Sequence, residues 1–308
     1  MNISRIKLRH LQVLLVVAQE RNLVKAAQSL SVSQPAVSKS LSELESIVGQ
    51  RLLERHRRGV ELTPAGEVLL QHAGASMRSL REGLDAVASQ PDARQLGVAV
   101  GALPNVASSL LPAAIELLRA GTPRLHLRVL SGTNAQMLSR LRQGELDLVF
   151  GRLPEPSDMV GLHFEQLYAE PLRLAVRRRH PLLTAKKLAP GLLSHYPLVL
   201  PVAGTPIRRT MDAFLVSHGV AYPDCVVETV DTWFALQYVL RTDAVWFLPA
   251  GVLHGAIRPA PIVPLALDTR KTSGAVGLTS RRDVALPDGA HMLADALRAA
   301  VRLQPAAE

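Results

Sequence analysis

Residues 26–45, AAQSLSVSQPAVSKSLSELE, decide the fold of the N-terminal part of this chain. They combine the end of one short amphipathic helix, a tight polar turn and the beginning of a second helix. Ser33 is of a type that commonly caps a helix, and Pro35 stands in the first helical turn, where its missing N–H costs no hydrogen bond. The spacing of the apolar residues therefore predicts helices over 23–30 and from 34 to about 48, joined as a helix-turn-helix.

The segments on both sides extend this motif. Leucines at helical spacing predict an earlier helix over 7–20, and residues 52–62, LLERHRRGVEL, indicate two short strands around a basic turn. Thr63 and Pro64 open a further helix that reaches about residue 90, a rod of roughly 40 Å. One face of this rod is mostly apolar, and a face of that length needs a partner. The side chains on that face are Val68, Leu69, His72, Met77, Leu80, Leu84 and Val87.

The 308-residue chain is basic, and its basicity is uneven. It holds 35 Lys or Arg against 26 Asp or Glu, and the first 66 residues alone hold ten basic residues against five Glu. Such asymmetry is typical of proteins that bind nucleic acid or membranes. Hydrophobic residues at 48% and charged residues at 20% favour a globular protein of two or three domains. They exclude a mainly disordered chain, a collagen and a long coiled coil.

The sequence also limits where the protein works. No apolar run approaches the ~18–20 residues that span a bilayer. Basic residues before the apolar run 13–18 imitate a signal peptide, but this run is shorter than the ~7–15 residues of a secretory core. We therefore expect a cytoplasmic protein with no membrane partner. Cys225 is the single cysteine, which excludes an intramolecular disulfide and a cysteine-based zinc cluster.

A helix-turn-helix followed by a basic hairpin has the composition of a DNA-binding winged domain. The second helix of such a motif fits the major groove and reads base edges with its first turns, while a basic wing suits phosphates or the minor groove. The alternative is an ordinary three-helix domain with one exposed polar helix and a solvated run of charge. The candidate DNA-binding residues are Gln34, Pro35, Ala36, Ser38, Lys39 and Ser42 on the helix, and Arg55, Arg57 and Arg58 on the wing.

From residue 95 onward, strand-like apolar runs alternate with helical patterns, which predicts an α/β fold. In such folds, ligands bind beyond the carboxyl ends of strands and close to helix N-termini. Three loops satisfy that condition, at 102–106, 131–134 and 201–208. We expect strands over 96–101, 125–130, 146–150, 172–176, 197–200, 226–230, 244–248 and 275–279, and helices over 108–120, 135–143, 205–218, 232–241 and 290–303.

Residues 26–45, together with LLER at 52–55 and LTPAG at 62–66, resemble the signature of LysR-type transcriptional regulators. The resemblance implies double-stranded promoter DNA, a small-molecule effector, a second copy of the chain in a homodimer or homotetramer, and RNA polymerase as partners. It implies an effector domain of two Rossmann-like lobes, similar to periplasmic binding proteins. The expected parts are a winged helix-turn-helix domain at 1–63, a linker and dimerisation helix at 64–92, and an effector-binding domain at 93–308, with lobe I at about 93–168 and 270–304 and lobe II at about 169–269.

A narrower resemblance concerns the pathway. Residues 5–12, 70–75, 100–104 and 144–153 are similar to those of LysR-type regulators of protocatechuate catabolism, the pca operon type. This similarity implies control of an aromatic-acid catabolic operon. Regulators of sugar pathways in the same branch share part of the pattern, so control of sugar or other organic-acid uptake stays an alternative, because a fold does not fix its ligand.

The three loops of the α/β region contain the candidate effector-binding residues. The resemblance implies that hydroxyls and backbone N–H groups in these loops bind effector carboxylates, and an arginine can pair with a carboxylate through two hydrogen bonds. As alternatives, Thr133 serves only as a helix cap and Arg208 is a solvated surface residue. The candidates are Asn105, Ser131, Thr133, Thr205 and Arg208.

The sequence contains no enzyme signature that we recognise. It lacks Gly-x-Ser-x-Gly, His-Glu-x-x-His and a phosphate loop. Its ten histidines are scattered, and no activating base stands near Cys225 in the sequence. We therefore expect no catalytic residue, no metal site and no cofactor. Two alternatives from other classes remain, namely a secreted solute-binding protein and a small-molecule transferase or isomerase.

Overall fold

The computed structural model describes residues 3–56, 59–88, 96–121, 125–253, 261–282 and 284–303. The chain forms two compact units. The first consists of Met1–Gln95 with Ser139–Leu146, and the second of Leu96–Leu138 with Asp147–Glu308. In the described part of the chain, no helix has both the length and the apolarity needed to cross a membrane.

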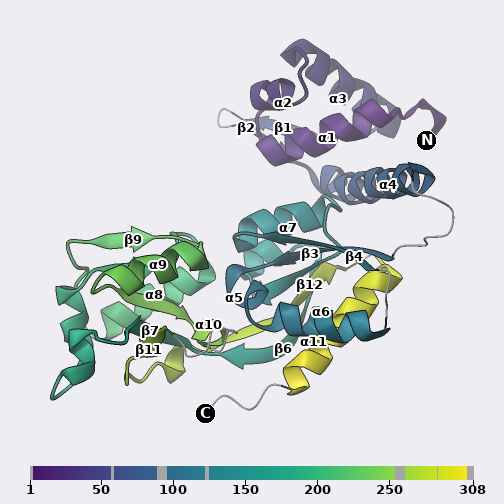
Figure 1. Ribbon diagram of the computed structural model, residues 1–308. Coiled ribbons are helices and arrows are strands. Elements are labelled where there is room, and N and C mark those ends of the chain that lie inside the picture. Colours follow the sequence, from purple (N-terminus) through teal and green to yellow (C-terminus); the bar gives the residue numbers. More distant parts are fainter. Residues whose placement is uncertain are drawn as a thin grey trace. The chain divides into compact units, whose positions relative to one another are not determined.

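The N-terminal unit is a winged helix-turn-helix, which confirms the predicted helices and strands (Figure 1). Its helices begin and end at local signals. Asn22 Oδ1 accepts hydrogen bonds from two backbone N–H groups at the beginning of α2, and Ser33 Oγ accepts one at the beginning of α3. Gly49 ends α3 in the left-handed conformation with φ 76°. The elements are α1 Leu8–Glu20, α2 Leu23–Ser29, α3 Gln34–Val48, β1 Leu53–His56, β2 Gly59–Leu62 and α4 Pro64–Ala88.

A single apolar cluster holds the three helices and the wing together. It contains one face from each of α1, α2 and α3, residues of the wing, and Leu70 from α4. Each fully buried valine or leucine side chain stabilises the fold by about 1.5–3 kcal/mol. The buried members are Val13, Leu14, Val17, Ala26, Ala27, Val37, Leu41, Leu44, Leu52, Leu53, Val60 and Leu70.

The base of the wing is fixed by polar contacts from helix α3. Glu45 Oε1 accepts hydrogen bonds from the backbone N–H groups of Leu52, at 2.7 Å, and Leu53, at 3.2 Å. On the other side, the Thr63 hydroxyl donates to the carbonyl of Arg51 at 2.8 Å and caps α4. Gly66 has to be a glycine, because a Cβ there would lie 2.0 Å from the carbonyl oxygen of Leu52. The orientation of the wing on α3 therefore depends on these few atoms.

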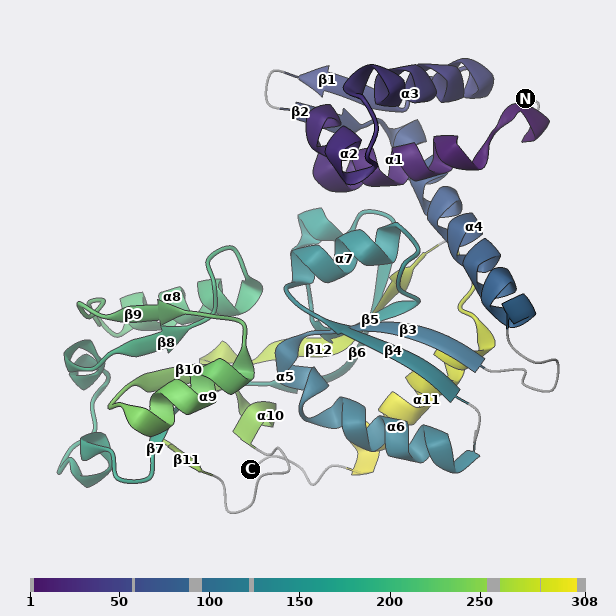
Figure 2. The same cartoon turned by 45° about the horizontal axis from the view of Figure 1, so that its top comes forward.

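The second unit contains two five-stranded mixed sheets, which we call lobe I and lobe II. In lobe I the order is β4-β3-β5-β12-β6, with β3, β4 and β5 parallel and β12 antiparallel to both of its neighbours. Figure 2 shows the yellow-green β12 among teal strands that come more than 100 residues earlier. The strands are β3 Leu96–Ala102, β4 Leu125–Ser131, β5 Leu148–Arg152, β6 Leu162–Glu170 and β12 Gly274–Arg281, and the helices are α5 Pro104–Ala107, α6 Leu110–Gly121, α7 Asn134–Arg142 and α11 Asp288–Leu303.

Lobe II has the order β11-β7-β10-β8-β9. The strands β8, β9 and β10 are parallel, whereas β7 runs antiparallel to β10 and to β11. The parallel strands are therefore extended by antiparallel ones in each lobe, a mixed variant of the expected Rossmann-like arrangement. The strands are β7 Leu172–Arg177, β8 Leu198–Leu200, β9 Val226–Glu228, β10 Val245–Pro249 and β11 Ile262–Pro264, and the helices are α8 Pro206–Ser217, α9 Thr232–Arg241 and α10 Ala250–Leu253.

The chain passes between the lobes twice. Pro171 separates β6 of lobe I from β7 of lobe II, and residues 265–273 lead back from β11 to β12. The Leu172 N–H donates to the Thr272 hydroxyl at 2.8 Å, so the two passages are joined by a buried hydrogen bond. The Thr272 hydroxyl in turn donates to the carbonyl of Thr269 at 2.6 Å.

Several elements differ from the sequence-based expectation. The strand β6 was not expected, because His163, Glu165 and Gln166 interrupt its apolar pattern and its burial is irregular. The short elements α5, α10 and β11 were also absent from the prediction, since three or four residues show no clear period. As a result, α6 begins at Leu110 and not at Ser108.

We predict that Glu45→Ala loosens the wing and lowers the stability of the N-terminal unit by about 1–3 kcal/mol, because two partly buried N–H groups lose their acceptor. Urea unfolding followed by circular dichroism measures this change. The control is Glu45→Gln, whose amide oxygen still accepts a hydrogen bond and which should lose clearly less. Equal unfolding midpoints for the alanine variant and the parent would show that the clamp does not support the wing.

Candidate DNA interface and effector cavity

The first turns of α3 present the predicted recognition residues to solvent. Gln34, Pro35, Ala36, Lys39 and Ser42 are exposed, and Ser38 is half-buried. The Gln34 amide donates to Ser38 Oγ at 3.1 Å, which orients its side chain along the helix. The same helix buries its other side in the core. All six residues therefore lie on the part of α3 that is not packed in the core.

The orientation of α3 is also held from α1 by a cluster that sequence reasoning missed. His10, whose side chain is 2% exposed, accepts a hydrogen bond at Nδ1 from the N–H of Lys7. This leaves the ring proton on Nε2, which donates to Glu43 Oε2 at 3.2 Å. Arg9 contacts the same carboxylate oxygen at 3.1 Å. The hydrogen bond from His10 and, to a smaller extent, the contact with Arg9 hold the pKa of the Glu43 carboxyl below its ordinary value.

The wing contributes one of its three predicted arginines to the described structure. Arg55 lies on β1 and is exposed. Arg57 and Arg58 lie outside the described residues. On the described strands of the wing, His56 contacts Glu54 at 3.6 Å and Glu61 at 3.9 Å. With Arg55 and these two carboxylates, the wing carries both signs of charge.

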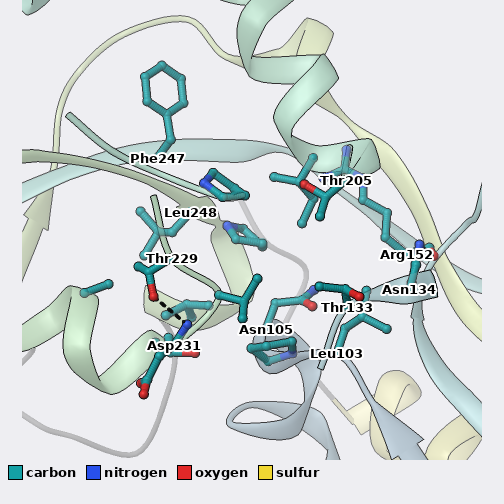
Figure 3. A pocket seen from close by; sticks show the side chains of 18 of the residues that line it. Leu103, Asn105, Thr133, Asn134, Arg152, Thr205, Thr229, Asp231, Phe247 and Leu248 are labelled. Carbon is teal, nitrogen blue, oxygen red and sulfur yellow. Dashed lines mark hydrogen bonds between the residues drawn. The ribbon is translucent and has the colours of Figure 1, made fainter. Parts of the chain in front are cut away.

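In the second unit, all three predicted loops meet at one cavity between lobes I and II (Figure 3). It encloses about 660 Å³ of empty space, including its open mouth. The loops follow the carboxyl ends of β3, β4 and β8, as the rule for α/β folds requires. Residues from lobe I are Leu103, Pro104, Asn105, Gly132, Thr133, Asn134 and Arg152; those from lobe II are Pro201, Thr205, Pro206, Ile207, Thr229, Val230, Asp231, Thr232, Ala235, Trp246, Phe247, Leu248, Pro249 and Val252.

Three of the five candidate effector residues line this cavity, namely Asn105, Thr133 and Thr205. Asn105 is buried and donates from Nδ2 to Glu170 Oε1 at 3.0 Å. Thr133 forms a reciprocal cap with Gln136 at the beginning of α7, in which its hydroxyl oxygen accepts the Gln136 N–H at 3.3 Å. The proposed capping role of Thr133 is therefore present, and its hydroxyl proton has no acceptor among the described residues.

Thr205 differs from Thr133 in the use of its hydroxyl. Its oxygen accepts the Arg208 N–H at 3.3 Å, and its proton is donated to the carbonyl of Val202 at 3.0 Å. A hydroxyl whose single proton is used in this way can accept a further hydrogen bond but cannot donate one to an anion. Of the two threonines, Thr133 is thus the better donor to a carboxylate.

The other two candidates, Ser131 and Arg208, do not line the cavity. Ser131 is exposed at the end of β4. The Arg208 guanidinium donates to Glu228 at 2.5 Å, to Asp212 at 2.8 Å and to the carbonyl of Pro201 at 3.1 Å. Burial works against its charge, but the hydrogen bonds to both carboxylates outweigh burial and raise the pKa of Arg208.

The expectation that Arg208 pairs with an effector carboxylate is therefore corrected, because two carboxylates of the protein already occupy this guanidinium. The solvated alternative also fails, since only 13% of the side chain is exposed. Arg208 instead fixes Pro201, a residue of the cavity wall.

Several cavity residues escaped the sequence analysis. Arg152 ends β5, and a charged residue at the last position of an otherwise apolar strand could have revealed it. Thr229 and Asp231 follow β9, where the same carboxyl-end rule applies. Asp231 Oδ1 accepts the N–H groups of Trp233, at 2.9 Å, and Phe234, at 3.0 Å, and so caps α9.

The electrostatics of the cavity favour an anion, and the one full positive charge among its described lining residues lies on the lobe I side. The first residues of α7, α8 and α9, which are Asn134, Pro206 and Thr232, all line the cavity. Helix N-termini carry a partial positive charge. Arg152 adds a full charge, and its burial lowers the pKa of the guanidinium against the opposing attraction of Glu170. On the lobe II side, Asp231 is an acceptor-only carboxylate.

Comparison with known proteins agrees with both halves of the fold. The family profile described as "Bacterial regulatory helix-turn-helix protein, lysR family" matches residues 8–67. The profile described as "LysR substrate binding domain" matches residues 93–302. Among solved structures, a full-length cysteine variant of OxyR from Pseudomonas aeruginosa aligns with a TM-score of 0.62 and 24% identity, covering 98% of this chain and 99% of that one. Full-length CbnR in complex with its target DNA aligns with a TM-score of 0.55 and 23% identity, covering 96% of this chain and 100% of CbnR.

Curated relatives that align with this chain over nearly their whole length are transcriptional regulators. The HTH-type transcriptional regulator PcaQ of Agrobacterium fabrum is 40% identical over 285 residues, which cover 91% of this chain and 90% of PcaQ. The uncharacterized HTH-type transcriptional regulator YdcI of Escherichia coli is 35% identical over 96% of both chains. These relatives are regulators and not enzymes, in agreement with the absence of a catalytic signature in the sequence. The chain therefore belongs to the LysR family of helix-turn-helix transcriptional regulators.

Proposed function

We propose that this LysR-type regulator binds promoter DNA through α3 and the wing, and that a small organic acid bound between its lobes controls it. The observation that carries the DNA-binding part is the division of α3 into two faces. Val37, Leu41 and Leu44 are buried in the core, while Gln34 and Lys39 stand in solvent. An exposed polar helix face on a unit with excess positive charge suits the major groove.

The side chains of this face differ in the DNA groups that they can bind. The Gln34 amide uses one N–H for Ser38, so its second N–H and its carbonyl oxygen are available for an adenine edge. Lys39 and Arg55 carry charges suited to phosphates or guanine. The structure of CbnR with its target DNA supports this use of a domain with the same fold.

We predict that Lys39→Ala and Arg55→Ala each weaken DNA binding and reduce the slope of log affinity against log salt by about 1, because each removes one charge that displaces a counterion. Fluorescence anisotropy with a labelled promoter fragment, repeated at several salt concentrations, measures both effects. Lys271→Ala removes an exposed charge from the second unit and serves as the control. If all three variants bind as the parent does, the DNA interface lies elsewhere.

The second part of the proposal concerns assembly. The long helix α4 exposes Val68, Leu80 and Leu84, whose side chains are 58%, 43% and 62% exposed. Three apolar side chains on one exposed helix mark a surface that another chain covers. We propose that α4 pairs with α4 of a second copy, which gives a homodimer and, through a further contact, a homotetramer. Two copies would place two recognition helices on half-sites about one helical turn, or a multiple of it, apart.

We predict that replacing Leu80 and Leu84 together by glutamate lowers the oligomeric state, because like charges would face each other across the pair. Light scattering at micromolar concentration measures the mass. The matched control is Val216→Glu, since Val216 is 77% exposed on α8 and lies outside α4. A parent protein that is already a monomer would contradict the proposal.

The third part concerns the effector and the pathway. The cavity combines helix N-termini, a buried guanidinium and apolar walls, which supports an organic acid as the ligand. The 40% identity with PcaQ and the resemblance to regulators of protocatechuate catabolism favour an aromatic-acid catabolic operon as the target. Such a regulator would work in the cytoplasm, where it meets promoter DNA and RNA polymerase. Closure of the lobes around the acid would shift the protein between two assemblies on DNA.

We predict that Thr133→Val weakens effector binding by about 1.5–3 kcal/mol, because a charged acceptor loses the free hydroxyl proton of Thr133. Calorimetry with a panel of aromatic acids and ring-cleavage diacids measures the affinity. Thr133→Ser keeps the hydroxyl and the helix cap and should bind nearly as the parent does. Thr205→Val should change the affinity less, because its proton is used within the protein. Unchanged binding by Thr133→Val would place the effector elsewhere.

A further inference from the structure

We propose that Arg152 is the anchor that selects the effector as a monocarboxylate with an apolar body, through a hydrogen bond from its Nη1 atom to the carboxylate. The inference rests on the proposed function, because it names the chemical class of the acid in the same cavity. It assigns the charge of the acid to lobe I and its uncharged remainder to lobe II.

Arg152 is buried and incompletely satisfied. The residue is 5% exposed, at the carboxyl end of β5, and it belongs to the cavity lining. Its Nη2 donates to the carbonyl of Thr272 at 2.6 Å. Its Nη1 is buried and has no hydrogen-bond partner among the described residues. A buried charged donor without an acceptor is costly, and an anion that supplies an acceptor removes that cost.

Neighbouring residues hold the Arg152 guanidinium in a fixed position. A Cβ at Gly274 would lie 2.2–2.6 Å from Arg152 Nη2, Nε and Cζ, so a glycine at 274 makes the room that the guanidinium occupies. The Thr272 carbonyl fixes Nη2 from the same passage between the lobes. Asn134 Nδ2 donates to the backbone carbonyl of Arg152 at 3.3 Å. A charge held in place before the ligand arrives loses little freedom on binding.

Glu170 attracts Arg152 without supplying the missing acceptor. The electrostatic influence of Glu170 on Arg152 opposes the effect of burial on the pKa of the guanidinium. The carboxylate oxygens of Glu170, however, accept from Asn105 Nδ2 at 3.0 Å and from the Gly251 N–H at 2.9 Å. Glu170 therefore keeps Arg152 charged inside the protein and leaves its Nη1 for another oxygen atom.

The other side of the cavity argues against a second carboxylate. Figure 3 shows Thr229 and Asp231 on the side opposite to Arg152 and Asn134. Asp231 carries a negative charge there and already accepts the first N–H groups of α9, while Thr205 caps α8. The remaining walls are mostly apolar. A diacid would bring its second charge toward an apolar wall or toward Asp231, which costs free energy. A ring or alkyl body fits, and a hydroxyl on it could donate to Asp231. The apolar side chains are Leu103, Ile207, Val230, Phe247, Leu248 and Val252.

The first test needs no variant. Calorimetry on the full chain compares benzoate with benzamide, its nearly isosteric neutral analogue, and with cis,cis-muconate, a diacid. We expect benzoate to bind at least about tenfold more tightly than benzamide, because the charge-assisted hydrogen bond is lost in the amide. We also expect muconate to bind more weakly than benzoate. Equal affinities for benzoate and benzamide, or tighter binding of muconate, would overturn the inference.

The second test changes the anchor. R152Q should weaken benzoate binding by roughly 10–100-fold and leave benzamide binding nearly unchanged. R152K keeps the cation and should lose less, although one ammonium cannot reproduce two fixed N–H groups. Arg241→Gln, which removes an exposed arginine at the end of α9, is the control. Thermal unfolding of each variant checks that it folds; if R152Q does not fold, the comparison of R152K with the parent decides.

The outcomes separate this inference from the function on which it rests. If R152Q and R152K bind benzoate as tightly as the parent while Thr133→Val weakens it, the cavity holds the acid and Arg152 is not its anchor. If the parent binds none of the three probes, the assignment of a monocarboxylate is wrong. In both cases, promoter binding by anisotropy remains an independent test of the regulator's function.

Discussion

The two passages of the chain between the lobes are the constraint on which the effector-binding unit depends. A single hydroxyl, that of Thr272, joins them by accepting the Leu172 N–H, and the Thr272 carbonyl holds Arg152. Strands β6 and β7 meet at the first passage, and β11 and β12 are joined by the second. The arrangement of the two lobes around the cavity therefore depends on these residues. Arg152 is one hydrogen bond away from Thr272 in the second passage and two away from Leu172 at the first. If the proposed acid binds Arg152, this short path would connect it to the few residues between the lobes, where a hinge would lie.

The N-terminal unit could be predicted almost completely because its signals are local. The cap at Ser33, the proline behind it and Gly49 fix both ends of α3 within one stretch of sequence. The contacts that orient α3 could not be predicted in the same way. His10 and Glu43 are 33 residues apart, and only the packing of α1 on α3 brings them together. Periodicity predicts which face of a helix is buried, but it does not identify polar partners on another helix.

The effector cavity shows where a rule of topology succeeds and where residue type misleads. Because strands in an α/β sheet end at one edge, the three loops could be named from the sequence alone. Choosing the arginine that meets the ligand required the structure. Arg208 stands at a helix start, which suggests an anion site, but Asp212 one turn later and Glu228 from β9 capture its guanidinium. In the sequence, Arg152 is only the last residue of a buried strand. The structure shows that its Nη2 donates to Thr272, 120 residues later, while its Nη1 has no partner among the described residues.

The two proposed sites use positive charge in opposite ways, and this difference follows from burial. Lys39 and Arg55 are solvated, so each would contribute to DNA binding mainly through released counterions and would contribute little to folding. Arg152 is buried with an unmet donor, so the free protein carries a desolvation cost that an acid can relieve. A ligand that binds only the folded protein stabilises it by RT ln(1 + [L]/Kd). Relief of the desolvation cost of Arg152 would lower the Kd of an acid and so increase this stabilisation. The same unmet donor that would favour an acid in the cavity would therefore also lower the stability of the protein when no acid is bound.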